Sequence, residues 1–409
     1  MPQSKIKILI HGLNFLPEQV GIGKFTGELA VDLVSRGYAV SVVTTPPYYP
    51  SWQVTAGYSA WSYQSESIDG IQIVRCPLWV PKRVTGLKRI LHLASFGLSS
   101  FPSILRKAVK RPYVLVVIQP TMFCLPAALL AAKIFGIKTW LHVQDFEVDA
   151  AFELGILKAG WLKKTILAIE AFLMRRFDRV SSITPRMVER LWEKGVPHDR
   201  SRLFPNWVDC NEIFPMANRD ELKDKFKLPN DKFLALYSGN IGEKQGLEII
   251  IDAARQLKHR NDLHFALCGD GAAIERLKDY AANLENISWL EVQPMERLNE
   301  LLNAADLHLL PQRADVADLV MPSKLTGMLA SGRPILATAF PETQLAEVLK
   351  DRGIVVTPEK SAEFAEAVET IMDNHESCKL FGLRARQFAE DCLDKKKIIS
   401  NFVEDLDTL

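Results

Sequence analysis

The sequence alternates between short apolar runs and stretches with apolar residues at helical spacing, a pattern typical of parallel α/β folds. An apolar run at 6–10 is followed by a glycine-containing loop, a helical pattern over 25–33 and a second run at 39–44. These elements predict a βαβ unit. The alternation continues and predicts a doubly wound sheet, with further runs at 114–118, 139–143 and 180–184.

A second series of the same kind begins at residue 233. The run at 233–238 leads into a glycine-rich loop and a helical pattern over 247–257, and later runs lie at 264–268, 307–310 and 334–338. A chain of 409 residues also exceeds the size at which one core usually stops growing. We therefore predict two Rossmann-like α/β domains, over 1–205 and 206–385, and a C-terminal helix over 386–409 that could return to the first domain.

Composition narrows the class of protein. The 48% hydrophobic and 24% charged residues indicate a globular chain, and a formal net charge of +1 gives no global attraction for nucleic acid, so we expect no nucleic-acid partner. Six dispersed cysteines without a CxxC pair favour reduced thiols over disulfides or a zinc site. No export signal is visible, and prolines and lysines interrupt the apolar region 113–141. We expect a cytoplasmic protein.

Two glycine-rich loops lie where a predicted strand gives way to a helix. In the first, over 17–24, Gly21 and Gly23 would let backbone N–H groups approach an anion, although a tight turn fits equally well. The second, over 238–246, adds a cation that could neutralise a diphosphate. Its candidate donor-binding residues are Gly239, Asn240, Lys244 and Gln245.

Two later segments are expected at the same carboxyl edge of the second sheet. Gly269, Asp270 and Gly271 form a turn after a predicted strand, where doubly wound folds bind nucleotides. Ser323 is placed to cap a helix and Lys324 to reach a phosphate. The alternative is a capped helix with a solvated lysine.

Taken together, these motifs resemble the GT-B glycosyltransferases of family 4, and the resemblance runs from residue 5 to about 405. It rests on the PExxGIG loop, the FPNW link at 204–207, the SGNIGEKQGLE loop, the GDG turn and the PSKLTGMLASGRP segment. Four further segments resemble a fucosyltransferase-type member of colanic acid biosynthesis: TPPYYP, YSAW, RCPL and HVQDFEVD, starting at residues 45, 58, 75 and 142.

The resemblance implies a GT-B fold with a nucleotide-sugar donor in the cleft between the domains, held mainly by the C-terminal half. It implies donor contacts at Gly21, Gly23 and the residues named above in the second domain, and an acceptor near 142–147. It also implies retention of the anomeric configuration.

This sequence departs from the family pattern in two places. Most of the family has an arginine and a lysine where Asn240 and Gln245 stand, and Lys244 could supply the missing cation. Most of the family also has two glutamates where Leu319 and Gly327 stand, and Asp315 or Asp318 could replace one of them.

Candidate catalytic groups lie at the end of the run at 139–143 and just beyond it. We expect His142, Asp145 and Glu147 just past the strand end, where they would contact sugar or acceptor, or else simply cap a turn. Asp-x-Asp occurs only at 405–407, and there is no histidine cluster. We therefore expect no metal and no cofactor, with lysines and helix N-termini stabilising the leaving diphosphate.

The segment 70–144 contains eleven Lys and Arg residues and no Asp or Glu. Apolar residues alternate with these cations, as in helices that lie on anionic lipid. We assign Lys88, Arg89, Arg106 and Lys107 to an acceptor and membrane surface, with 158–179 as a second candidate; the alternative is the solvated face of core helices. The hypothesis is peripheral binding to the inner face of the cytoplasmic membrane, where a lipid-diphosphate-linked saccharide would be presented.

Other functions remain open at this point. A nucleotide-sugar epimerase needs a Tyr-x-x-x-Lys pair, which the sequence lacks. A non-catalytic carbohydrate-binding relative is the stronger alternative, because both family glutamates are replaced. GDP-fucose is the favoured donor, and a UDP-sugar is the alternative.

Overall fold

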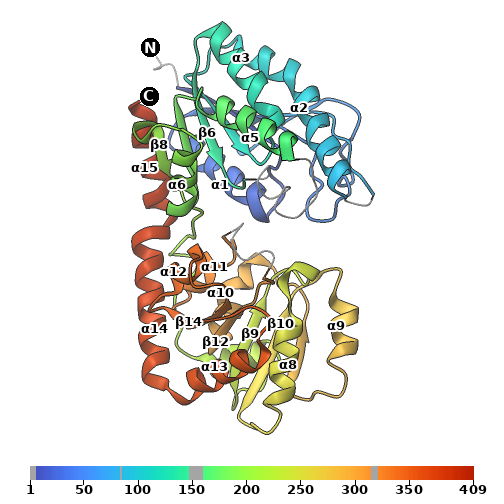
Figure 1. Ribbon diagram of the computed structural model, residues 1–409, viewed down its shortest axis with the longest axis vertical. Coiled ribbons are helices and arrows are strands. Elements are labelled where there is room, and N and C mark those ends of the chain that lie inside the picture. Colours follow the sequence, from blue (N-terminus) through green and yellow to red (C-terminus); the bar gives the residue numbers. More distant parts are fainter. Residues whose placement is uncertain (1–5, 83–84, 147–159, 315–320) are drawn as a thin grey trace. The chain divides into compact units, whose positions relative to one another are not determined.

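The computed structural model describes residues 6–82, 85–146, 160–314 and 321–409 (Figure 1). The chain forms two compact units, Met1–Pro205 with Ile399–Leu409 and Asn206–Ile398. Each contains a mainly parallel sheet covered by helices, which confirms the expected pair of Rossmann-like domains.

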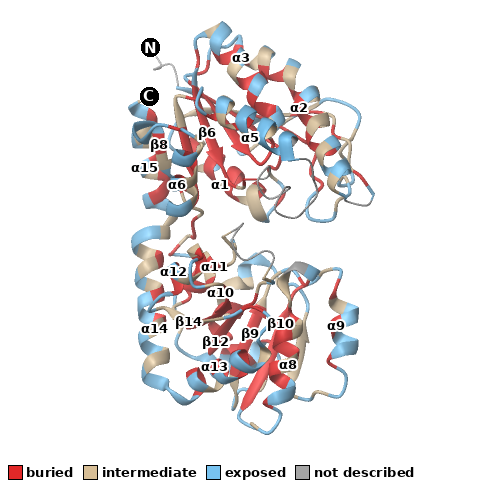
Figure 2. Ribbon diagram, viewed as in Figure 1, coloured by how far each residue is buried: buried red, intermediate tan, exposed pale blue. Residues whose placement is uncertain are grey.

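The first unit has an eight-stranded sheet in the order β3-β4-β2-β1-β5-β6-β7-β8, parallel except for the β3–β4 pair. Its strands are β1 (Lys7–Gly12), β2 (Ala39–Thr44), β3 (Gln64–Ile68), β4 (Ile71–Arg75), β5 (Val114–Gln119), β6 (Lys138–Val143), β7 (Arg179–Ser182) and β8 (Ser201–Leu203). All six residues of β5 are buried, as expected for a central parallel strand. Figure 2 shows the central strands of both sheets coloured mostly as buried.

Helices cover both faces of this sheet: α1 (Gly21–Ser35), α2 (Gly86–Ala108), α3 (Leu125–Phe135), α5 (Gly160–Met174) and α6 (Pro185–Glu193). The described residues of the two units also contain short 3₁₀ turns at Met122–Cys124, His198–Arg200 and Met295–Arg297, and one at Glu243–Gln245 in the loop after β9. The strand order reverses between β1 and β5, which places the loops after these strands at the position where doubly wound folds bind ligands.

The second unit has a six-stranded parallel sheet in the order β11-β10-β9-β12-β13-β14, the Rossmann arrangement, with its switch point between β9 and β12. Its strands are β9 (Phe233–Ser238), β10 (Leu263–Cys268), β11 (Ile287–Leu290), β12 (Leu307–Leu310), β13 (Ile335–Thr338) and β14 (Gly353–Val356). Its helices are α7 (Arg219–Lys225), α8 (Glu248–Gln256), α9 (Ile274–Tyr280), α10 (Leu298–Ala304), α11 (Leu325–Ala330), α12 (Gln344–Leu349), α13 (Ser361–Asp373) and α14 (His375–Phe388).

The C-terminal segment that joins the first unit is shorter than the 386–409 of the sequence analysis. Helix α14 and the π-turn Ala389–Leu393 belong to the second unit, where Arg386 donates to the carbonyl oxygens of Ile213 and Ala330 at 2.7 and 2.9 Å. From Ile399 on, α15 (Lys395–Asp407) belongs to the first unit. There Phe402 stacks on Phe204 and packs against Trp140, with ring centroids 4.8 and 4.6 Å apart.

Candidate functional site

The glycine-rich loop after β9 packs backbone to backbone against the turn after β10. The N–H of Gly239 donates to the carbonyl of Cys268 at 2.9 Å, and the N–H of Ile241 donates to the carbonyl of Asp270 at 2.8 Å. A Cβ on Gly269 would lie 1.9 Å from the carbonyl oxygen of Gly239, and one on Gly271 2.4 Å from that of Ile241. Only glycine fits at these two positions, so the two loops form one rigid edge.

Lys324, which precedes α11, extends over this edge. Its Nζ lies 4.0 Å from the centroid of the Tyr237 ring, and a Cβ on Gly239 would lie 3.4 Å from the same Nζ. Tyr237 is itself fixed, since its hydroxyl donates to the carbonyl of Asn240 at 2.6 Å. Among the residues that the structure describes, no carboxylate or carbonyl pairs with the Lys324 ammonium group. A half-buried cation of this kind is ready for an anion.

The environment of Lys324 changes its protonation. Desolvation lowers the pKa of its ammonium group to about 7, because the charged form loses water without gaining a carboxylate. Burial likewise raises the pKa of the Tyr237 hydroxyl, so this ring stays neutral beneath the lysine. Perturbed groups at the carboxyl edge of a doubly wound sheet are typical of functional sites.

The other predicted donor residues surround this edge. Asn240 and Asp270 are exposed, and the Asp270 carboxylate accepts from the N–H of Gly271 at 2.7 Å. Gln245, in the 3₁₀ turn Glu243–Gln245, has a buried Oε1 atom without a hydrogen-bond partner among the described residues. The side chain of Lys244 lies outside the described part. Ser323 is exposed and does not cap α11, whose N-cap residue is Lys324 without a side-chain hydrogen bond, so that prediction is wrong.

In the first unit, the loop after β1 is organised by a buried carboxylate that the sequence analysis did not single out. Glu18 Oε1 accepts from the N–H groups of Tyr48 and Tyr49 at 2.9 and 2.8 Å, and Oε2 accepts from Asn14 at 2.9 Å. Burial raises the pKa of Glu18, and these hydrogen bonds oppose the rise. A Cβ on Gly23 would lie 2.9 Å from that of Glu18, so this glycine makes room for the carboxylate.

His142 is not past the strand end but inside β6, contrary to the prediction. Its side chain is 3% exposed, and Nδ1 and Nε2 lie 2.9 Å from Ser181 Oγ and 3.0 Å from Gln144 Nε2. Burial lowers the pKa of His142 to about 3, so the imidazole is neutral at physiological pH. Both ring nitrogens are occupied within the fold, which indicates a structural role instead of proton transfer.

Asp145 does follow the strand, and its side chain is half-buried. Burial raises the pKa of the Tyr49 hydroxyl, with Arg89 opposing the rise and Asp145 and Glu18 adding to it. The structure therefore brings Asp145, Tyr49 and Arg89 into one electrostatic neighbourhood. Gly21 borders it, because a Cβ there would lie 3.8 Å from Tyr49 Cε1. Glu147 lies outside the described residues.

Comparison with known proteins assigns the chain to a family. The family model described as "Glycosyl transferase 4-like domain" matches residues 20–207, and the model described as "Glycosyl transferases group 1" matches residues 218–388. WcaI of Escherichia coli K12, named as a glycosyl transferase of colanic acid biosynthesis, is 39% identical over 413 residues, which cover 98% of this chain and 100% of WcaI. This chain belongs to the family 4 glycosyltransferases of the GT-B class.

Solved structures share the glycosyltransferase fold at low sequence identity. Sucrose-phosphate synthase from Thermosynechococcus elongatus has a TM-score of 0.75 at 15% identity, covering 98% of each chain. Anabaena HepE in complex with UDP has a TM-score of 0.71 at 15% identity, covering 98% of this chain and 100% of HepE. At such identity the likeness concerns the fold alone.

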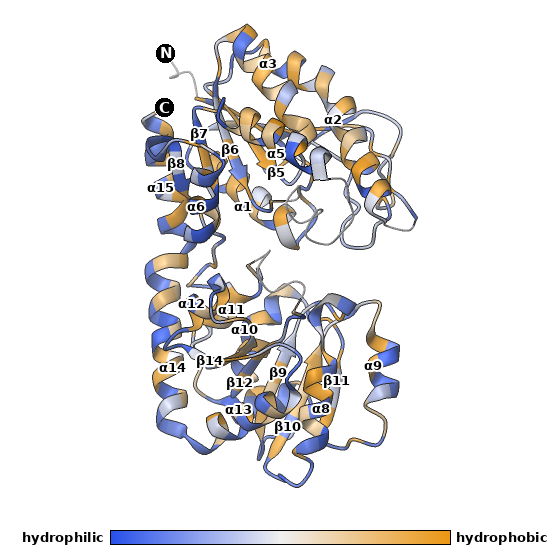
Figure 3. Cartoon of the chain, viewed as in Figure 1, coloured by the Kyte–Doolittle hydropathy of each residue, from blue (hydrophilic) through white to orange (hydrophobic). Residues whose placement is uncertain are grey.

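The basic helix α2 of this glycosyltransferase presents two different faces. Leu93, Phe96 and Ile104 are among the apolar residues that alternate with the cations in 70–144, and they are buried in the core, so a lipid-facing assignment is wrong for them. Leu87, Leu91 and Leu98 are exposed away from the core, with Lys88 and Arg106 exposed beside them. Arg89 is also exposed but stands seven residues before Phe96, on the side of the buried residues, and Lys107 is half-buried. Helix α2 therefore keeps a solvent-facing stripe of leucines and cations, formed by Leu87, Lys88, Leu91, Leu98 and Arg106. In Figure 3 the ribbon of α2 alternates between hydrophobic and hydrophilic colours.

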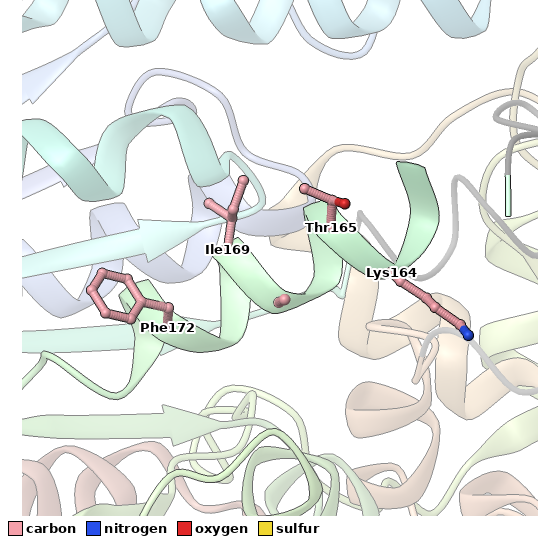
Figure 4. Close-up of a pocket in the computed structure, with 5 residues that line it drawn as sticks. Lys164, Thr165, Ile169 and Phe172 are labelled. Atoms are coloured by element: carbon pink, nitrogen blue, oxygen red, sulfur yellow. The ribbon is translucent and has the colours of Figure 1, made fainter. Parts of the chain in front are cut away.

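Helix α5, in the second basic segment, has a similar outer face. A shallow hollow of about 440 Å³ runs along it and is lined by Lys164, Thr165, Ala168, Ile169 and Phe172 (Figure 4). Arg176 lies over the Phe172 ring, with its Cζ 4.5 Å from the centroid. Among the described residues, no helix is long and apolar enough to cross a bilayer.

Two residues of this glycosyltransferase escaped the sequence analysis. Glu18 belongs to the quoted PExxGIG motif, and a carboxylate beside two glycines was the available signal. Tyr237 gave no sequence signal, because an aromatic residue near the end of an apolar strand is normally interpreted as a core residue. Its proximity to Lys324 arises only in the folded chain.

Proposed function

We propose that this glycosyltransferase moves a sugar from a nucleotide-diphosphate donor, with GDP-fucose favoured, to a lipid-diphosphate-linked or saccharide acceptor during synthesis of a colanic-acid-like exopolysaccharide. The pathway rests on the similarity to WcaI, and the choice of fucose rests on the HVQDFEVD and TPPYYP resemblance. The observation that carries donor binding is Lys324, a half-buried cation without a described partner above the Gly239 and Gly269 loops.

In the proposed reaction, negative charge develops on the leaving diphosphate. Lys324 supplies a cation already in place, so little reorganisation accompanies charge development. Gly239 leaves room for the Lys324 side chain beside the loop, since a Cβ there would lie 3.3 Å from Lys324 Cδ. Asp145, beside Tyr49 and Arg89, is the candidate for contacting the acceptor hydroxyl. We propose that the reaction retains the anomeric configuration and requires no divalent metal or other cofactor.

Two alternatives have specific support. A UDP-sugar donor is favoured by the fold of HepE, which was solved with UDP. A non-catalytic carbohydrate-binding relative is favoured by Gly327, which stands in the middle of α11 where the resemblance places a glutamate. Leu319, at the other such position, lies outside the described residues.

The deciding experiment is a thermal-shift titration without added metal against GDP, UDP, GDP-fucose and UDP-glucose. A ligand at 100 times its dissociation constant stabilises the native state by about 2.7 kcal/mol. We expect the largest shift with the guanine nucleotides and no change on adding a chelator. A shift only with uracil nucleotides would replace the proposed donor, and a shift abolished by chelator would overturn metal independence.

Transfer itself is measured with the nucleotide that binds. We expect release of the nucleoside diphosphate when a lipid-diphosphate-linked saccharide is present, and an NMR coupling constant in the product that matches the donor anomer. Tight donor binding without any transfer or donor hydrolysis would favour the non-catalytic alternative. An inverted product would overturn retention.

We also propose that the protein works on the inner face of the cytoplasmic membrane and binds it through the stripe of leucines and cations on α2. A basic residue close to anionic lipid contributes about 1 kcal/mol, so Lys88→Glu with Arg106→Glu should abolish pelleting with phosphatidylglycerol vesicles at low salt. Lys258→Glu with Lys360→Glu, two exposed cations of the second unit, is the matched control. Equal pelleting of the α2 variant and the control would overturn this attachment.

A further inference from the structure

The short loop after β6 is anchored on both sides of Asp145. Gln144 and Phe146 are buried, whereas Asp145 between them is half-buried. Gln144 is held by the His142 ring, and Ser181 Oγ lies 2.9 Å from His142 Nδ1 and 2.8 Å from Trp140 Nε1. The first anchor therefore consists of strand residues of the sheet itself.

The second anchor comes from helix α6. Phe146 is 5% exposed, and its ring centroid lies 5.4 Å from Lys194 Nζ and 5.5 Å from Arg190 Cζ. The two cations stand four residues apart, on one face of the helix end. Both distances lie within the range of cation–π attraction, which strengthens when the groups are removed from water.

Local structure fixes where Lys194 stands. Thr184 caps the start of α6 by accepting from the N–H of Met187, and Pro185 occupies the first turn. The helix ends at Glu193 with Lys194 as its C-cap residue, and Gly195 follows with a φ of +82°, a left-handed conformation that suits glycine. Lys194 therefore leaves the helix end at a defined point, beside the Phe146 ring.

A buried carboxylate holds Lys194 in that position. Lys194 Nζ lies 2.8 Å from Oε2 of Glu170 on α5, and the two side chains are 10% and 0% exposed. Gln119, the buried last residue of β5, donates to Glu170 Oε1 at 3.5 Å. Glu170 is the one acidic residue in the sequence of α5, and it faces the interior instead of the basic outer side.

Stability alone gives a poor reason for this pair. Removing two charges from water costs about as much as their attraction returns, and well-packed apolar residues often serve equally well. The distinctive property of a buried pair is its fixed geometry. Here that geometry sets the position of an ammonium group, and through it of Phe146, one residue from Asp145.

We propose that Lys194 is a positioning residue for the transfer reaction: paired with Glu170, it holds the Phe146 ring and so fixes Asp145 toward the acceptor. This inference rests on the proposed function of Asp145. Misplacement of a reacting group by about 1 Å can cost roughly 100-fold in rate. Loss of the pair should therefore lower kcat and leave donor binding in the second unit unchanged.

The test compares Lys194→Met with Lys194→Arg in the full-length protein, at a temperature where both are folded. We expect kcat to fall roughly ten- to hundredfold in Lys194→Met, with donor KM unchanged and substantial recovery in Lys194→Arg. Arg202→Met is the control, because it breaks a half-exposed 2.7 Å pair with Asp405 elsewhere in the same unit. A folded Lys194→Met enzyme with kcat within twofold of the wild type would overturn the proposal.

A double-mutant cycle asks whether the effect passes through Asp145. In an Asp145→Asn background, Lys194→Met should cause little further loss, since the group it positions is already gone. Phe146→Leu should behave like Lys194→Met. Fully additive losses would show that Lys194 acts by another route and would overturn the proposal.

Hydrogen exchange separates this inference from the proposed function. Without any substrate, the amides of 144–146 should exchange at least tenfold faster in Lys194→Met than in the wild type, and remain unchanged in Arg202→Met. If the wild-type protein transferred no sugar, the proposed function would fall, while exchange would still decide the positioning role. Unaltered exchange in Lys194→Met would overturn that role, whatever the activity.

Discussion

The two glycine-rich loops occupy equivalent places in their sheets but use their charged groups in opposite ways. In the first unit, the carboxylate of Glu18 accepts three hydrogen bonds from Asn14, Tyr48 and Tyr49, and Gly23 packs against it. In the second, the loop packs on another glycine turn, and the cation above it, Lys324, has no hydrogen-bond or ion-pair partner among the described residues.

The difference shows that a strand–glycine loop–helix motif does not by itself define an anion site. A buried carboxylate in the first loop satisfies the backbone donors of a neighbouring segment and disfavours a second negative charge nearby. In the second loop, the charge is positive and lacks a partner, and its pKa of about 7 reflects desolvation without compensation. The first loop is closed by its own side chain, and under the proposed function the donor diphosphate completes the second.

Replacing Lys324 by alanine is the strongest way to break this comparison. Loss of a desolvated charged partner typically costs about 3 kcal/mol, so donor affinity should fall roughly 100-fold. Because the ammonium group is disfavoured in the folded state, Lys324→Met should not lower the free energy of unfolding at pH 7. Calorimetric titration and urea unfolding measure the two effects. Loss of stability with affinity intact would show that Lys324 is a structural residue.

Replacing Glu18 should produce the converse result. Glu18→Ala leaves three donors without an acceptor and should lower the free energy of unfolding by about 2–3 kcal/mol, while Glu18→Gln keeps an acceptor oxygen and should cost much less. Donor affinity should be unchanged in both variants. Urea unfolding and the same titration decide the matter, and weaker donor binding in a stable Glu18→Gln protein would contradict a purely structural carboxylate.

The pH dependence of donor binding sharpens the role of Lys324. With a pKa of about 7 in the free protein, its ammonium group must regain a proton when an anion binds above that pH. Affinity for GDP-fucose, whose diphosphate diester does not titrate in this range, should be constant below pH 7. It should then fall by up to tenfold per pH unit as the pH rises toward the higher pKa of the complex. The slope should vanish in Lys324→Ala, and an unchanged slope would assign the proton to another group.

The sequence predicted the fold because buried parallel strands carry continuous apolar runs, which are visible without any tertiary information. The same property explains the misplacement of His142. His142 lies within the apolar run at 139–143 and within β6, but the partners that occupy its imidazole inside the sheet, Ser181 and Gln144, are not visible in the run. An apolar run locates a strand but not the hydrogen-bond partners of a polar residue within it.

The sequence predicted which positions form the candidate site but not the surroundings of their side chains. The glycines at 239, 269 and 271 were identified from the loops they occupy, and their function depends on backbone angles that only the fold imposes. The significance of Lys324 depends on having no partner among the described residues, and that of Lys194 on Glu170 and Phe146, which are distant in the sequence. A single sequence carries no record of such neighbours.

The smallest expected effect concerns Gly21 and refines the view of the first loop. Gly21 has a φ of +56°, and the nearest atom to an added Cβ, Tyr49 Cε1, would lie 3.8 Å away, so only the backbone angle disfavours a side chain. Gly21→Ala should therefore cost about 1 kcal/mol in urea unfolding, and Gly21→Asn less, because asparagine tolerates this conformation. Equal losses would mean that the angle is not the constraint. A fall in donor affinity in a fully stable Gly21→Asn protein would instead show that the space over Gly21 receives a ligand, and the contrast between the two loops would then lie in the kind of ligand and no longer in its presence.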